Sequence, residues 1–178
     1  MHWTLALALV AFAWGCAPEP FVCPTVEAAD ETFPTGAIYE DQRALAALVD
    51  TVPGFGGTYV MPDQVHLAVL LVEPTQALAD QARDALVEIY GERPWRNNPA
   101  TPKKTTYDYA QLWRYELRSW DVFVIEDMQT LGIDHFTGVV HYGVVSEDAK
   151  ACVESNLRAL EIPEDAFRVE VEGPLVEN

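Results

Sequence analysis

The sequence carries the same order of secondary-structure signals twice, and this doubling is the feature that most restricts its fold. In each copy a β-hairpin is followed by a helix and then by a single strand. The predicted segments are hairpin 58–72, helix 75–90 and strand 104–106, then hairpin 132–145, a helix after Ser146 and strand 167–171. The shared order predicts two similar units within one α+β domain.

The most apolar segment of the first unit is residues 65–72, where only His66 interrupts a run of aliphatic side chains. A strand with one wet face alternates apolar and polar residues, whereas a nearly continuous apolar run indicates a strand covered on both faces. We therefore expect a central strand here. Further helices are predicted at 41–51 and 107–120, and the aromatic stripe of the second of these helices indicates a core-facing side.

The N-terminus predicts export. From Trp3 to Gly15 every residue except Thr4 is apolar, a length too short to span a bilayer but typical of a signal-peptide core. Gly15 and then Cys16, followed by polar residues and prolines, resembles a bacterial lipoprotein signal. We therefore expect a signal peptide at 1–15 and a lipid on Cys16 that anchors the protein to a membrane in the cell envelope or periplasm.

Two alternatives to lipidation remain open. The sequence Ala11-Phe12-Ala13 also fits the small-x-small rule for ordinary signal cleavage, which would release a secreted soluble protein. A short buried N-terminal helix is the third reading, although the segment lacks a polar face.

Residues 16–40 are interpreted as a tether, because they hold several prolines among acidic residues and show no hydrophobic period. Residues 41–178 then form a single domain, whose length is sufficient to bury one core. Once Cys16 is lipidated, Cys23 and Cys152 form an even pair that would be bridged in an oxidising compartment. The alternative is two free thiols, with Cys152 packed as a small apolar residue.

The net charge of −17 argues against nucleic acid as a partner, because phosphates would be repelled over most of the surface. Residues 91–118 are the exception, with six basic residues against three acidic ones. Four basic residues of its loop form a possible contact patch for an acidic partner or a lipid head group: Arg93, Arg96, Lys103 and Lys104. The alternative is a solvated face that neutralises acidic neighbours.

A family resemblance rests on the apolar strand at Val65 and on three further segments: FGGTY (55–59), YDYAQL (107–112) and LEIPEDA (160–166). They resemble small secreted bacterial domains of unknown function, which are similar in turn to the pro-regions of alpha-lytic-type serine proteases. The resemblance implies a ferredoxin-like α+β fold, a mostly antiparallel sheet built from two hairpin-helix-strand units with helices packed on it. It also implies binding of another protein through that sheet. No protease domain follows within these residues, so we expect such a role only in trans.

Catalytic and cofactor signals are sparse. None of the three serines lies in a Gly-x-Ser-x-Gly elbow, no phosphate-binding glycine loop precedes a helix, and we expect no cofactor. A two-residue turn at Thr137-Gly138 would place Asp134 opposite His141, and it would put His135 on the other face, so no metal site is expected. The pair Asp134 and His141 is either a general base oriented by an acid or an ordinary cross-strand ion pair.

These observations favour a non-enzymatic, lipid-anchored interaction or envelope module. An inhibitor or chaperone acting in trans on an exported protease is the first alternative, suggested by the pro-region resemblance. A hydrolase using Asp134 and His141 is the second.

Overall fold

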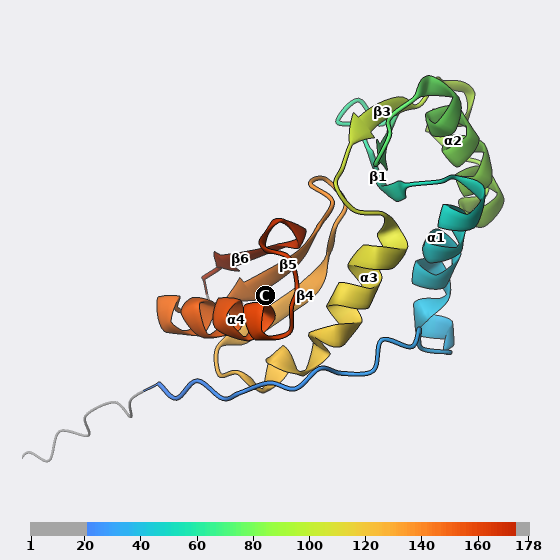
Figure 1. Cartoon of the computed structure of the whole chain (residues 1–178). Helices are drawn as coiled ribbons and strands as arrows, with labels where there is room; N and C mark the ends of the chain where they lie inside the picture. The colour runs from blue at the N-terminus through green and yellow to red at the C-terminus, as the bar shows by residue number, and fades with distance from the viewer. Residues whose placement is uncertain (1–20, 174–178) are drawn as a thin grey trace, which may run out of the picture.

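The computed structural model describes residues 21–173, so the predicted signal peptide and the lipid attachment site at Cys16 lie outside the described residues. Within the described range, helices and two three-stranded sheets confirm the predicted α+β class. Figure 1 shows two groups of strands and helices on either side of a central helix, α3 (Tyr109–Arg118). None of the helices described is both long and apolar enough to reach across a bilayer.

The first unit contains one sheet in the order β1-β2-β3. β1 (Phe55–Val60) and β2 (Leu67–Leu71) are antiparallel, and β3 (Thr101–Lys104) is parallel to β2. α2 (Gln76–Tyr90) makes the crossover that a parallel connection requires, while α1 (Glu40–Thr51) packs on α2 and β1. Every residue of β2 is buried, which confirms the prediction of a central strand.

The second unit repeats this topology in the order β4-β5-β6. β4 (Met128–Asp134) and β5 (Val139–Val144) form the hairpin, and α4 (Glu147–Ala159) crosses over to β6 (Phe167–Val171), which is parallel to β5. The connections contain the 3₁₀ turns η1 (Ala37–Tyr39), η2 (Pro94–Asn97), η3 (Trp120–Val124) and η4 (Glu164–Ala166). The predicted repetition of hairpin, helix and strand is therefore confirmed.

The strands are divided between two mixed sheets instead of forming one mostly antiparallel sheet. The expectation that the helices of both units pack on the same sheet is wrong, because α2 packs on β2 and α4 packs on β5 and β6. α3 lies between the two hairpins and contacts β1 on one side and β4 and β5 on the other, which keeps the sheets apart. The structure as a whole remains compatible with a ferredoxin-like α+β arrangement.

α3 supplies residues to both hydrophobic cores. Tyr109 and Trp113 are buried in the core of the first unit, whereas Leu112 is buried in the core of the second. The helix begins at a capping box, in which the Asp108 carboxylate accepts from the Gln111 N–H at 2.8 Å and the Gln111 side chain accepts from the Asp108 N–H at 3.2 Å. One well-defined helix therefore fixes the position of one unit relative to the other.

The loop of the second hairpin, residues 135–138, also joins the units, and Figure 1 shows it reaching toward the first sheet. The rings of Phe136 and Tyr59 have centroids 4.7 Å apart, and His135 lies 5.7 Å from the Tyr109 ring. Gly138 has a φ of 69°, a left-handed conformation that favours glycine, and a Cβ at this position would collide with the Thr105 hydroxyl.

The N-terminal strap, residues 21–36, is the extended segment that Figure 1 shows in blue along the body of the protein. It has no helix or strand, as expected for a tether, but it is packed against the domain and not free. Val26 is buried, and its N–H donates to the Asn156 side chain at 2.8 Å. Phe33 stacks on Trp113 with ring centroids 4.1 Å apart. The predicted tether at 16–40 therefore needs correction over its described part, since its apolar side chains complete both cores.

A disulfide between Cys23 and Cys152 fixes the start of the strap to α4, across a sequence separation of 129 residues. The Cα atoms of the two cysteines are 5.5 Å apart, an ordinary distance for a bridge. Asn156, one turn further along α4, donates to the Pro24 carbonyl at 3.0 Å. The pairing that the sequence left open is thus formed in the structure, which is consistent with an oxidising compartment.

Candidate functional site

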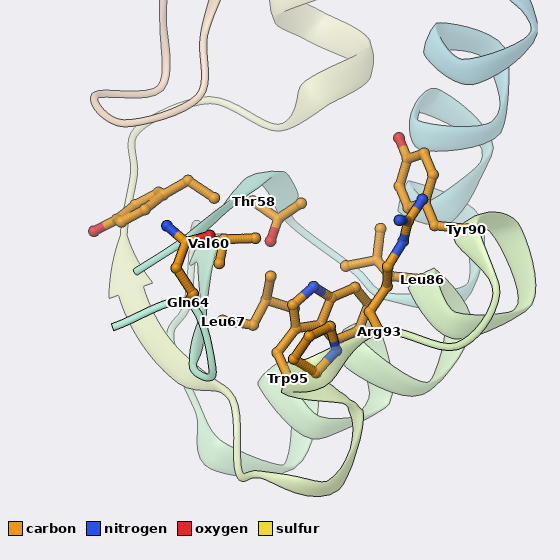
Figure 2. Close-up of a pocket in the computed structure, with 10 residues that line it drawn as sticks. Thr58, Val60, Gln64, Leu67, Leu86, Tyr90, Arg93 and Trp95 are labelled. Carbon is orange, nitrogen blue, oxygen red and sulfur yellow. The ribbon is translucent and has the colours of Figure 1, made fainter. Parts of the chain in front are cut away.

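The first unit contains a pocket of about 440 Å³ beside the edge strand β1. It lies between β1 and the segment that follows α2, as the close-up in Figure 2 shows. The lining residues are Thr58, Tyr59, Val60, Gln64, Leu67, Leu86, Tyr90, Arg93, Pro94 and Trp95. Its volume is in the range of small-molecule sites, which are mostly apolar and carry a few polar groups.

The base of the pocket is apolar because the chain turns inward directly after α2. Gly91 ends that helix with a φ of 72°, and Pro94 begins the 3₁₀ turn η2. This turn buries Trp95, which is only 5% exposed, beside the fully buried Leu86. Figure 2 shows Trp95 between Leu67 on one side and Leu86 and Arg93 on the other.

The rim of the pocket carries the polar groups. The Thr58 hydroxyl donates a hydrogen bond to the Ala68 carbonyl at 2.8 Å. Gln64 lies in the β1–β2 turn with a φ of 63°. Burial, and to a lesser degree the charge of Asp41, raises the pKa of Tyr90, so its hydroxyl keeps its proton at neutral pH. Arg93 is exposed at the rim.

Arg93 differs from the other arginines. In the part of the chain that the structure describes, it is the only arginine whose side chain makes no ion pair, hydrogen bond or ring contact. Its sequence neighbour Glu92 is paired with Arg96 instead. The pocket therefore has one uncompensated positive charge at its rim.

A second hollow of about 470 Å³ adjoins this pocket and shares Thr58 and Tyr90 with it. It lies where the two units meet, and its other lining residues are Asp41, Gln42, Leu45, Tyr109 and His135. Burial lowers the pKa of His135, which keeps the imidazole neutral at pH 7. Its Nδ1 is buried and has no hydrogen-bond partner among residues 21–173. Burial likewise raises the pKa of Tyr109.

The predicted pairing of Asp134 with His141 is wrong. Asp134 lies opposite Val139 and His141 lies opposite Gly132, because the hairpin loop has four residues and not two. The Asp134 carboxylate accepts from the Phe136 N–H at 2.8 Å and from the Thr137 hydroxyl, so it stabilises its own loop.

His141 has other neighbours on the open face of the second sheet. Its Nε2 lies 3.5 Å from a Glu170 oxygen and 3.6 Å from a Glu172 oxygen. Nowhere in residues 21–173 do three or more His, Cys, Asp or Glu side chains gather in a way that could hold a metal ion.

The four basic residues of the possible contact patch occupy different surroundings. Arg93 lines the pocket and Arg96 is paired with Glu92. Lys103 and Lys104 are exposed at consecutive positions of the edge strand β3, so their side chains point to opposite faces of the sheet. The structure therefore links one member of this group, Arg93, to a concave site.

The pocket was not among the sites that the sequence predicted, since its lining comes from four separate stretches of the chain. One signal was available in the loop after α2, where Trp95 is a large apolar residue in a segment of prolines and charges. An aromatic residue in such a loop is usually packed inward, and Trp95 is.

The fold and the pocket together define a two-unit α+β protein with a small concave pocket in its first unit. No family model matches the sequence, and searches of curated proteins and of solved structures found no match.

Proposed function

We propose that this protein is an exported binding module, anchored to a membrane through a lipid on Cys16, whose binding site is the pocket over Trp95. The observation that carries the proposal is the pocket itself, an apolar base and a polar rim in one of two topologically equivalent units. Such a site can bind a ligand, because its lining combines apolar side chains with the hydroxyl groups of Thr58, Tyr59 and Tyr90.

Export is supported by two features outside the pocket. The leader has the pattern of a signal peptide followed by a cysteine, and Cys23 is bridged to Cys152 in the described part of the chain. The alternative of a hydrolase based on Asp134 and His141 required the two residues to lie opposite each other, and they do not.

The pocket is tested with N-phenylnaphthylamine, a neutral apolar dye whose fluorescence rises in apolar surroundings. We expect saturable binding of one dye per wild-type chain. Val60→Trp should weaken binding at least about tenfold, because the indole would fill a pocket in which Val60 is a partly exposed lining residue. Val171→Trp is the matched control, because Val171 is similarly exposed, at 42%, on β6 of the other unit.

Equal dye binding by wild type and Val60→Trp, or no saturable binding at all, would refute the pocket as a binding site.

Anchoring is tested separately by expressing the full chain with its own leader and supplying labelled fatty acid. Label at Cys16 and partition into detergent are expected. A mature N-terminus at Trp14 without label would refute lipidation and leave a secreted soluble module.

A further inference from the structure

We infer that the pocket over Trp95 takes a small amphiphile with one carboxylate, its apolar body against the indole and its carboxylate at Arg93. This inference rests on the proposed function, because it requires that the pocket binds a ligand. It adds the chemical class of that ligand and the residue that selects it.

The apolar body of the ligand is inferred from the base of the pocket. Leu67, Leu86 and Trp95 are all buried, and Val60 and Pro94 continue the apolar surface toward the rim. A volume of about 440 Å³ is sufficient for a chain of several methylenes or a ring system. Each methylene that leaves water for such a surface should strengthen binding about fourfold.

The carboxylate is inferred from the charge at the rim. The chain as a whole carries −17, so an anion is repelled from most of its surface. At this pocket Arg93 can attract an anion, because its own positive charge is not neutralised. The nearest acidic residue in sequence, Glu92, is already paired with Arg96. The guanidinium presents a planar set of donors that matches the two oxygens of a carboxylate.

Tyr90 supports the same orientation of the ligand, with its carboxylate at Arg93. It lines the pocket together with Arg93, and Figure 2 shows both side chains at the same side of it, opposite Gln64. Its protonated hydroxyl can donate a hydrogen bond to a carboxylate, and so can the Arg93 guanidinium. An ammonium group would find no carboxylate among the residues that line the pocket.

The inference is tested by displacing N-phenylnaphthylamine with three eight-carbon competitors: octanoate, octanol and octylammonium. At pH 7 and low salt we expect octanoate to displace the dye about five to ten times more effectively than octanol. Octylammonium should be the weakest competitor. The advantage of octanoate over octanol should shrink at high salt, because an exposed ion pair is screened.

Arg93→Gln should abolish the preference for octanoate without weakening the binding of octanol. Arg168→Gln is the matched control, since it removes the same charge from an exposed arginine on β6 of the other unit and leaves the pair of Glu92 with Arg96 intact. The control variant should keep the preference for octanoate.

The outcomes separate the inference from the proposed function. Failure of the dye to bind refutes the pocket itself. Normal dye binding with equal competition by octanoate and octanol, or a preference that persists in Arg93→Gln, overturns the carboxylate while the pocket stands. A wild-type dimer that Val60→Trp converts to a monomer would also overturn the inference, because a second copy would then occupy the site.

Discussion

Replacing Glu116 with glutamine should stabilise the protein at neutral and alkaline pH and leave its stability unchanged in acid. Glu116 lies on α3 between the two cores. Burial raises the pKa of Tyr109 in one core and of Tyr142 in the other, and the charge of Glu116 adds a smaller contribution to both. Within the described residues its carboxylate has no ion pair or hydrogen bond. Burial raises the pKa of Glu116 from 4.5 to about 7.

The direction in which the free energy of unfolding changes with pH follows from the protons bound in the folded and unfolded states. Between pH 4.5 and 7 the folded state holds a proton on Glu116 that the unfolded state has lost, so the free energy of unfolding falls as pH rises. Each pKa unit is worth about 1.4 kcal/mol, so the shift from 4.5 to about 7 sets an upper limit of about 3.5 kcal/mol at pH 7 and above. Glutamine carries no charge at any pH and escapes this loss.

Urea unfolding of wild type and Glu116→Gln should therefore give similar free energies near pH 4 and a gap that opens to a plateau above pH 7. The control is Glu88→Gln, which removes the same charge from an exposed position on α2. A gap that is independent of pH, or one that Glu88→Gln reproduces, would refute the argument that burial of Glu116 opposes its ionisation.

Two further predictions concern the covalent and backbone constraints. Replacing Cys23 and Cys152 together by serine should lower the free energy of unfolding by about 5 kcal/mol on a chain-entropy estimate, given the separation of 129 residues. An unchanged urea midpoint would show that the bridge does not constrain the unfolded chain. Gly138→Ala should cost about 1–3 kcal/mol by the same assay, because its φ of 69° and a crowded neighbour disfavour a Cβ. Gly132→Ala, whose Cβ would meet nothing within 4 Å, should cost less, and equal costs would contradict this reasoning.

The repeat and the central strand were predictable because hydrophobic periodicity records which faces are buried. The strap was not, because its burial depends on isolated residues. Val26 and Phe33 follow no period, and the bond from Val26 to Asn156 spans 130 positions of sequence. A segment rich in proline gives no sign of such a distant partner.

The predicted register of the second hairpin was wrong for a local reason. Thr137-Gly138 resembles a two-residue turn, but the side chain of Asp134 binds its own loop and lengthens it to four residues. The resulting shift is an even number of positions, so each side chain keeps its face. His141 therefore stays on the face that was expected and gains different neighbours. The pocket, in contrast, exists only in the folded chain.

The disulfide also limits how far the protein can stand from a membrane. With the proposed anchor at Cys16, Cys23 lies seven positions further along the chain, and a fully extended chain of that length reaches at most about 25 Å. A tether running to residue 40 would have reached about 80 Å. Reduction of the bridge would leave the hydrogen bonds that Pro24 and Val26 make with Asn156 as the first fixed point, so the length of the leash would then depend on the packing of the strap and no longer on a covalent bond.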